Sequence, residues 1–585
     1  MNLINCSHTG SRIALCGAAL FLFISCGWGE FSARDAAPKA PMAVLFELDG
    51  PLPQFAQPGL FGVDVPSQFQ LEKKIKRASN DILVQEIIFH IGAPQIGWTR
   101  ALELSNAIAR AAKRKPVTCL VTSADNQGYW MAARSCPTLL VAPAGDIALV
   151  GLAAENIFVK DLLDNIGIAI DVLAAGRYKN AAESLTRTDM SEASREATTA
   201  LLDSLHATFV SGISQGRKLP REQIDALIDN GPYTADDAHK AQLVDGVKSV
   251  GTLFTALSQK YEGGLVADYG KEAPKPIEVG DIFKLFSGKR PEATQDTKPK
   301  IALISLIGTI KSGRETDAIF AAEDSVYDLS LIETLAKAAE DKSVKAVVLR
   351  IDSPGGSALA SDNIWEAVQA LAAVKPVVAS MGDVAASGGY YIASAATEVI
   401  AAPTTITGSI GVIGGKVVVQ KAAEKWGVKS ERIARGRNAG MLSPFEPFSE
   451  ADRELLTRHI QHTYELFVAR VSAGRDLSPE DVHAHAEGRV WSGADALKHK
   501  LVNATGTLET SIQRARKLIH DERIPVELYP QPRNFFEVIA EQLNAPTDEA
   551  RLLSQLSGAQ DATVLGQLLL RESVLAVSPH FLRIR

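Results

Sequence analysis

The chain contains an internal repeat, and this duplication limits its possible folds more than any other feature. Lys115–Val117 (KPV) recurs as Lys375–Val377, 260 residues later. Ser191–Glu196 (SEASRE) returns as Ser449–Glu454 (SEADRE), 258 residues later. Near-constant offsets in an unchanged order indicate a duplicated domain rather than chance similarity. The 585 residues must therefore build one structural plan twice.

Each copy has the pattern of an α/β domain. In the second copy, Val344–Ile351 and Pro376–Met381 are short β-branched runs typical of buried parallel strands. Ser361–Ala373, between them, has the apolar spacing of a helix, and such a β-α-β unit predicts a parallel sheet covered by helices. Ser449–Arg470 is expected to form a longer amphipathic helix that begins after Ser449.

The repeat divides the chain into five parts. Residues 1–40 are a leader with a linker, and residues 41–262 are the first copy. A linker rich in proline, glycine and charge covers 263–300, followed by the second copy at 301–525. The tail, 526–585, has no repeat partner, and its apolar helical stretch Thr563–Leu570 is expected to contact a neighbouring subunit or a membrane.

Composition excludes several classes of protein. A hydrophobic fraction of 46% with 22% charged residues is that of an ordinary globular protein, which excludes wholesale disorder. The net charge of −7 disfavours nucleic acid as a partner. Outside the leader only Cys119 and Cys136 remain, in no CxxC or Cys/His cluster, so neither a disulfide framework nor a zinc site is expected.

The leader contains an apolar run. Ile13–Trp28 is an uncharged segment of 16 residues preceded by Arg12, the layout of a signal peptide or a short membrane anchor. A full span needs about 20 residues, so cleavage and marginal anchoring both stay open. Cys26 ends a loose lipobox and adds lipidation as a third possibility. The body is expected outside the cytoplasm, with membrane association through this segment.

The second copy contains three glycine-rich motifs. Asp352–Gly356 (DSPGG) follows a strand, and its open backbone N–H groups suit an oxyanion, although a tight turn alone would also explain it. Ser387 lies within Gly382–Tyr390 (GDVAASGGY), among small residues that would let a substrate backbone approach; a serine that caps a helix is the plain alternative. Thr407–Val412 (TGSIGV) supplies another hydroxyl, Ser409.

The sequence offers Ser387 no histidine partner but does offer a lysine. The segment around Ser387 lacks GxSxG, the chain has no HExxH, and the glycines at 408–414 match neither a dinucleotide nor a Walker motif. Aligning the two copies places Lys179 opposite Ala439, Asn126 opposite Ser387, and Ala93–Ile96 opposite the second copy's glycine turn. The first copy thus keeps a lysine without a nucleophile, and the second keeps a nucleophile without a lysine.

These motifs resemble those of the signal peptide peptidase A family in its long, duplicated form. Gly176–Ala181 (GRYKNA) is similar to the family's lysine motif, and the three motifs of the second copy are similar to its oxyanion turn, its nucleophile motif and the segment whose serine orients the lysine. The resemblance covers about residues 41–525. It implies an α/β fold of two tandem ClpP/crotonase-like domains, each a superhelix of ββα units. It also implies a homotetrameric serine endopeptidase on the periplasmic face of the bacterial inner membrane, acting on cleaved signal peptides and other short apolar peptides.

The resemblance implies a Ser-Lys dyad that needs no metal or cofactor. Ser387 would be the nucleophile, Lys179 the general base, and Ser409 the residue that orients the lysine. The oxyanion would be held by backbone N–H groups of Gly355, Gly356 and Gly388, a contribution of about 3 kcal/mol per donor.

A lysine with this role must be neutral. Its usual pKa of about 10.4 leaves roughly one molecule in 2,500 uncharged at pH 7, a cost of about 4.6 kcal/mol. Burial can lower a lysine pKa by about 3–5 units. We therefore expect Lys179 in a dry crevice between the two copies, with the Glu183 carboxylate turned away from it.

Two other classes of protein stay open at this stage. A crotonase-type acyl-CoA enzyme would use similar glycine turns, and a non-catalytic envelope scaffold would use the duplication only for assembly. The sequence also leaves open whether Lys179 meets Ser387 within one chain or across a subunit boundary.

Overall fold

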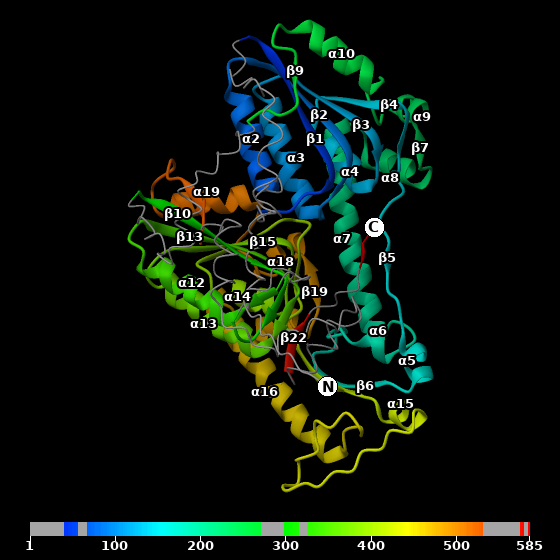
Figure 1. The fold of residues 1–585 in the computed structure, drawn as a ribbon, viewed down its shortest axis with the longest axis vertical. Coiled ribbons are helices and arrows are strands. Elements are labelled where there is room, and N and C mark those ends of the chain that lie inside the picture. Colours follow the sequence, from blue (N-terminus) through cyan, green and yellow to red (C-terminus); the bar gives the residue numbers. More distant parts are fainter. Residues whose placement is uncertain are drawn as a thin grey trace, which may run out of the picture.

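The computed structural model describes residues 40–55, 67–270, 298–314, 325–530, 574–577 and 583–584. Most of them form two α/β lobes, one from each copy, stacked along the long axis of the molecule (Figure 1). The leader run Ile13–Trp28 and the tail stretch Thr563–Leu570 lie outside the described residues, so the predictions for them stay predictions. Among the described helices, none combines the length and apolarity needed to cross a bilayer.

The first copy is built on a mainly parallel sheet. Its four central strands follow one another in chain order and pair in parallel, as the β-α-β pattern predicts. Within the described residues the sheet has seven strands: β7 (Tyr233–Thr234), β4 (Thr138–Ile147), β3 (Val117–Ala124), β2 (Val84–Gln95), β1 (Met42–Pro51) and β9 (Leu265–Val266), with β8 (Gly246–Val247) beside β4.

The second copy repeats this plan. Its strands β10, β13 and β15 also pair in parallel, and the expected strands at 344–351 and 376–381 are confirmed as β13 and β15. The eight strands described are β19 (Val490–Ser492), β17 (Ile406–Gly408), β15 (Val377–Ala386), β13 (Val344–Ser353), β10 (Lys300–Ile307) and β21 (Val526–Leu528), with β16 (Glu398–Ala401) beside β15 and β20 (Ala504–Thr505) beside β16.

Helices cover both faces of each sheet. On β13, Val347 and Leu349 belong to the core under the helices α12 (Asp328–Glu340), α13 (Ala358–Ala372), α14 (Gly388–Ala393) and α16 (Glu450–Arg475). Ala346 and Val348 point to the other face and pack with α19 (Leu508–Leu518). Burial on both faces explains why β13 is an almost continuous apolar run rather than an alternating one.

The two 26-residue helices α7 and α16 begin after Ser191 and Ser449, whose side chains accept hydrogen bonds from the first turn as the repeated motif predicts. The helices of the first copy are α2 (Gln68–Asn80), α3 (Trp98–Ala112), α4 (Asn126–Ser135), α5 (Lys160–Ile166), α6 (Glu183–Thr186), α7 (Glu192–Arg217), α8 (Arg221–Asp229), α9 (Ala235–Lys240) and α10 (Val250–Lys260). Those of the second are α12 (Asp328–Glu340), α13 (Ala358–Ala372), α14 (Gly388–Ala393), α15 (Gln420–Lys425), α16 (Glu450–Arg475), α17 (Pro479–His485), α18 (Gly493–Lys498) and α19 (Leu508–Leu518).

A third sheet joins the two copies. The first copy sends an arm beside the second lobe (Figure 1), and its strand β6 pairs antiparallel with β18 over seven residue pairs, from Ala175 with Val412 to Ala169 with Val418. The strand order is β12 (Ser325–Tyr327), β11 (Thr309–Lys311), β14 (Gly355–Ser357), β22 (Val574–Val577), β18 (Val412–Val418) and β6 (Ala169–Ala175). A separate pair is formed by β23 (Arg583–Ile584) and β5 (Ala154–Glu155).

A buried ion pair also links the copies. Arg350 on β13 has no exposed surface, and its guanidinium lies 2.9 Å from the Glu103 carboxylate of α3, which is 4% exposed. The same arginine donates to the carbonyl oxygen of Met381 at 3.1 Å. Because both charges are removed from water, loss of either partner would leave the other as an uncompensated buried charge between the lobes.

The two cysteines outside the leader form a disulfide. Cys119 on β3 and Cys136, at the end of α4, have Cα atoms 5.9 Å apart and are linked through sulfur. This single bond was not predicted from the sequence, in which the two cysteines lie 17 residues apart. The bond ties the helix that begins at Asn126 back to the neighbouring strand.

Candidate active site

Ser387 lies at the sharp junction between β15 and α14. Its backbone has φ 53° and ψ −116°, a conformation that costs a non-glycine residue free energy and is frequent at functional sites. Its side chain is fully buried and occupies the N-cap position, yet makes no capping hydrogen bond. The plain alternative, a serine that only caps a helix, therefore does not describe this residue.

The small residues around Ser387 serve close packing as well as access. A Cβ on Gly388 would lie 2.4 Å from the Ser361 hydroxyl oxygen, and one on Gly389 would lie 2.7 Å from the carbonyl oxygen of Ser353. Any larger residue here would push α14 away from the second copy's glycine turn. The motif thus holds Ser387 and that turn together.

Lys179 reaches this junction from the first copy. It follows β6 through Gly176, whose φ is 112° and whose Cβ would lie 2.5 Å from the Glu487 backbone. Tyr178 donates its backbone N–H to the carbonyl oxygen of Glu487 at 2.7 Å. A Cβ on Gly488 would lie 2.5 Å from the Lys179 backbone nitrogen. Gly176 and Gly488 therefore allow the backbone segment before Lys179 to pass close to the segment at Glu487 and Gly488. The pairing of β6 with β18 therefore delivers the lysine within a single chain.

The Lys179 amine contacts both candidate hydroxyls. Its Nζ lies 2.7 Å from Ser387 Oγ, 3.0 Å from Ser409 Oγ and 2.9 Å from the carbonyl oxygen of Ser409. Ser409 is fully buried with φ 52°, and its backbone N–H donates to the carbonyl oxygen of Arg489 at 2.7 Å. A neutral amine can donate two hydrogen bonds and accept one. Donation to the two Ser409 oxygens would leave its lone pair facing Ser387 Oγ.

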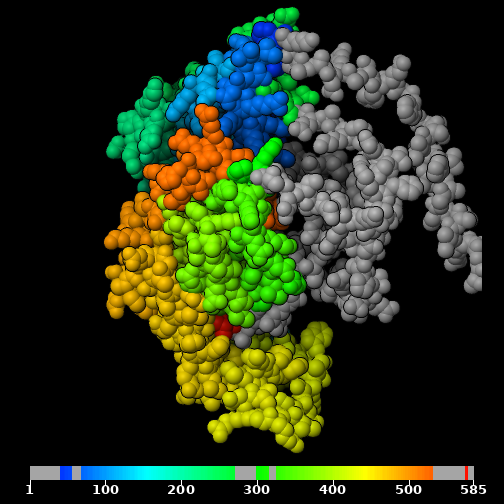
Figure 2. Space-filling model, turned by 90° about the vertical axis from the view of Figure 1, so that its left-hand side faces the viewer, coloured from blue at the N-terminus to red at the C-terminus, as the bar shows by residue number. Residues whose placement is uncertain are grey.

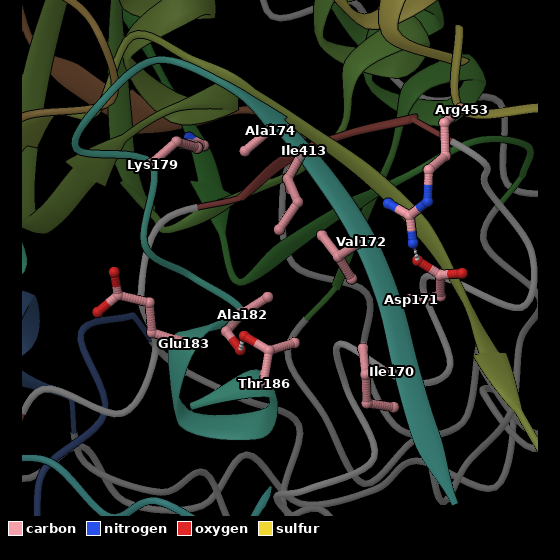
Figure 3. Close-up of a pocket in the computed structure, with 10 residues that line it drawn as sticks. All are labelled: Ile170, Asp171, Val172, Ala174, Lys179, Ala182, Glu183, Thr186, Ile413 and Arg453. Carbon is pink, nitrogen blue, oxygen red and sulfur yellow. Dashed lines mark hydrogen bonds and ion pairs between the residues drawn. The ribbon is translucent and has the colours of Figure 1, made fainter. Parts of the chain in front are cut away.

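Burial lowers the pKa of Lys179 well below its usual 10.5. The residue is 6% exposed, and desolvation by burial is the cause of the shift. The Glu183 carboxylate accepts a hydrogen bond from the Ser191 backbone N–H at 3.2 Å instead. Figure 3 shows that carboxylate well apart from the Lys179 amine. Among the described residues, the lysine is thus surrounded by hydroxyl and carbonyl oxygens in a largely dry setting.

The glycine turn faces Ser387 but differs from expectation in one detail. Gly355 has φ 103°, and its N–H donates to Ser353 Oγ at 3.1 Å, so this group is already bonded within the turn. A Cβ on Gly355 would lie 2.7 Å from the Gly388 nitrogen and 3.1 Å from Ser387 Cβ. The N–H groups of Gly356 and Gly388 are thus the better candidates for holding an oxyanion, and Gly355 leaves the space that one would occupy.

Asn126, the residue of the first copy that stands opposite Ser387, makes ordinary structural contacts. The Asn126 side chain accepts from the Val150 backbone N–H at 2.9 Å and donates to the carbonyl oxygen of Gly151 at 2.8 Å. Ala439, opposite Lys179 in the repeat, is exposed. The described residues thus bring the lysine and serine together once rather than twice.

A cavity of about 340 Å³ adjoins Lys179. Ile170, Val172 and Ile413 give it apolar walls, and Figure 3 shows Lys179 at one end and the ion pair of Asp171 with Arg453 at the other. Neither this cavity nor β22 was expected from the sequence.

Comparisons with known proteins agree with the duplication. The profile of Peptidase family S49 matches residues 109–262 and again 369–520, and the Clp protease profile matches 315–410. Serine protease SPPA, chloroplastic, of Arabidopsis thaliana is 31% identical over 460 residues, which are 78% of this chain and 66% of that protein. Protease 4 of Haemophilus influenzae is 29% identical over 533 residues, 88% of this chain and 85% of that protein. Protease 4 of Salmonella typhi is 31% identical over 427 residues, 72% of this chain and 66% of that protein.

The fold and these similarities define a serine protease built from two ClpP-like α/β repeats, which confirms the expected fold class. The chain belongs to peptidase family S49, with the family's domain present twice.

Proposed function

We propose that the chain is an endopeptidase with a Ser-Lys dyad, in which Lys179 is the general base and Ser387 the nucleophile. The observation that supports this most is the 2.7 Å contact between Lys179 Nζ and Ser387 Oγ in a fully buried setting that lowers the lysine pKa. An uncharged amine beside a hydroxyl can accept its proton, as general-base catalysis requires. Ser409 acts as the positioning residue, because its two oxygens accept from the amine.

The reaction proceeds in two halves. Ser387 Oγ attacks the peptide carbonyl carbon while its proton passes to Lys179 Nζ; the lysine then protonates the leaving amine, and an ester to Ser387 remains. A water molecule then gives a proton to the same amine and attacks the ester carbon; as the bond to Ser387 Oγ breaks, the lysine returns that proton to Ser387 Oγ and the new carboxyl group is released. Gly356 and Gly388 donate their N–H groups to the oxyanion in both halves, worth about 3 kcal/mol per donor. The scheme uses no metal and no cofactor.

We propose short apolar peptides, including cleaved signal peptides, as the substrates. The apolar walls of the cavity beside Lys179 support this choice, as does the buried position of Ser387, which a folded protein surface could not reach. Hydrolysis of an apolar peptide ester, compared with its aspartate-substituted analogue and with an acyl-CoA thioester, tests the substrate class. Equal rates on all three would contradict it.

We propose that the protein works in the cell envelope, at the periplasmic face of the inner membrane. The Cys119–Cys136 disulfide supports an oxidising compartment, and the leader run Ile13–Trp28 supports export or anchoring. Fractionation of cells expressing the full chain tests this, and recovery in the cytosol would contradict it.

We propose a homotetramer as the assembly. The segment 429–435, which stands opposite β6 in the repeat, is exposed along its length and extends from the lower end of the molecule (Figures 1 and 2). Ile433 in this segment is 87% exposed, and Trp426, three residues before it begins, is 85% exposed. Because β6 pairs with a strand of the other repeat, its counterpart can pair with a second copy of the chain. Light scattering of wild type and Ile433→Asp tests this, and an unchanged mass would contradict the role of this segment.

Covalent labelling of Ser387 tests the dyad. A fluorophosphonate probe should label wild type but not Ser387→Ala, and Lys179→Ala should reduce the labelling rate by about 10²–10⁴-fold. The matched control is Lys416→Met, because Lys416 is also buried, at 5% exposure, but donates to the carbonyl oxygen of Met441. Near-normal labelling of Lys179→Ala would contradict the proposal.

A further inference from the structure

A three-residue segment of the second copy, Glu487–Arg489, connects the two motifs that build the dyad. Its first carbonyl oxygen accepts from the backbone N–H of Tyr178, the residue before Lys179, at 2.7 Å. Its last carbonyl oxygen accepts from the backbone N–H of Ser409 at 2.7 Å, and its central N–H donates to the carbonyl oxygen of Ile410 at 2.7 Å. This bridging segment therefore contacts both the lysine motif and the residue that positions the lysine.

The backbone of the bridging segment needs support from its surroundings. The φ angle is 54° at Glu487 and 81° at Gly488. Such a conformation costs free energy at a residue with a Cβ, and it persists only where neighbouring groups hold it. A Cβ on Gly488 would lie 2.6 Å from Lys179 Cα, so the segment lies directly against the lysine backbone. A shift of the bridging segment would therefore move Lys179.

The Arg489 side chain anchors this segment to the first copy. Its guanidinium lies 2.6 Å from the Glu196 carboxylate. The guanidinium carbon lies 5.0 Å from the centre of the Tyr178 ring and 4.6 Å from that of the Trp491 ring. The Tyr178 hydroxyl donates to the same carboxylate at 3.1 Å. The hydrogen bond from Arg489 is the largest of the causes that lower the pKa of Glu196, so the carboxylate stays charged at neutral pH.

Glu196 gives the arginine a fixed support. It lies on α7, the long helix that runs from the first lobe down beside the second (Figure 1). Leu201 and Leu205 of this helix pack with Val490, the residue that follows the bridging segment. The partner of Arg489 is thus held by the same copy that supplies the candidate base.

The repeat shows that the fold of a copy does not require this arginine. Thr234 and Ser492 cap the helices α9 and α18 and stand 258 residues apart, the offset of the SEASRE motif. The same offset places Gly231 opposite Arg489. The arginine is thus found in the copy that has the candidate nucleophile and is replaced by glycine in the copy that has Asn126 there. This distribution fits a role in the reaction.

We propose that Arg489 is a positioning residue of the reaction, which holds the bridging segment so that Lys179 and Ser409 keep the arrangement that activates Ser387. The inference rests on the proposed function and extends it to a side chain that contacts none of the reacting atoms. Without this anchor the bridging segment would shift and water would reach the amine. The pKa of Lys179 would then return toward 10.5.

The pH dependence of Ser387 labelling in the full chain tests the proposal, together with kcat and KM for an apolar peptide ester. Arg489→Met removes the anchor from the second copy and Glu196→Ala removes it from the first, so that failure of one variant to fold leaves the other. Arg217→Met is the matched control. Arg217 also belongs to α7 and pairs with Asp245 at 2.7 Å, but it lies roughly 30 Å along the helix from Glu196.

Arg489→Met should lower kcat and the fluorophosphonate labelling rate at least about tenfold, toward the roughly 100-fold that a 1 Å displacement of a reacting group can cost. The pH at which the labelling rate is half of its maximum should rise by about one unit, with KM unchanged. Glu196→Ala should change both quantities in the same direction, and Arg217→Met should change neither.

A purely structural role predicts a different result. Folded Arg489→Met with the rate and the half-maximal pH of wild type, or with a change in KM alone, would overturn the inference while leaving the proposed function intact. The proposed function fails by a separate result, the absence of fluorophosphonate labelling at Ser387 in wild type, and the role of Arg489 would fall with it.

Discussion

Replacing Lys179 by methionine should change how the stability of the protein depends on pH. Burial lowers the lysine pKa in the folded chain well below the 10.5 that it has when unfolded. Between these two values the unfolded state binds one more proton than the folded state. The free energy of unfolding of wild type must then rise with pH across this window, and the variant lacks that contribution.

The size of the effect follows from the single proton. One proton corresponds to about 1.36 kcal/mol per pH unit. Within the window, the free energy of unfolding of wild type should therefore rise by that amount per pH unit relative to the variant. The lost contacts to Ser387 and Ser409 shift the two curves by a constant amount and leave the difference in slope unchanged. Above pH 10.5 both states are neutral and the gain should end.

Urea unfolding from pH 7 upward measures this difference. Lys345→Met, at an exposed position of β13, is the control and should run parallel to wild type. Parallel curves for wild type and Lys179→Met would refute the reasoning, because they would mean that the amine keeps its proton when the chain is folded. That result would remove the base from the proposed dyad.

Three further predictions concern the surroundings of the dyad. Gly355→Ala should lower kcat/KM for peptide hydrolysis at least about 100-fold, because its Cβ fills the space beside Ser387. Gly313→Ala is the control, because Gly313 has a similar φ of 111° but open space around the added Cβ. Equal losses of kcat/KM in the two variants would contradict this explanation. Ser409→Ala should reduce kcat about 10–100-fold with KM unchanged, since the lysine loses one acceptor; a change in KM alone would assign Ser409 to substrate binding instead. Glu103→Gln should lower the free energy of unfolding by about 3 kcal/mol in urea titrations, because it leaves the buried Arg350 without its closest carboxylate, and a loss below about 1 kcal/mol would contradict that account.

The duplication and the local patterns predicted the fold well. The β-branched runs at 344–351 and 376–381 are strands, the segment between them is α13, and the SEASRE and SEADRE motifs begin the two long helices. These features depend on periodicity and capping within about 20 residues, which is information that a sequence contains directly.

The sequence contains weaker signals for the long-range contacts that assemble the candidate active site. Alignment of the copies singled out Lys179 and Ser387, but the pairing of β6 with β18 joins segments more than 200 residues apart and leaves no local pattern. The hydrogen bond from the Gly355 N–H to Ser353 Oγ depends on turn geometry, so the sequence could not exclude Gly355 as an oxyanion donor. The tail strand Val574–Val577 is four residues long, too short for alternation to separate it from a loop.

The pH dependence of Ser387 labelling tests the central claim most directly. In wild type, the second-order rate constant for labelling by the fluorophosphonate should keep its full value at neutral pH, because burial holds the lysine pKa well below 10.5. At lower pH, where Lys179 becomes protonated, the logarithm of this rate constant should fall by one for each pH unit. A rate constant that instead keeps rising until pH 10.5 would mean that the amine beside Ser387 is charged at neutral pH, which contradicts the account.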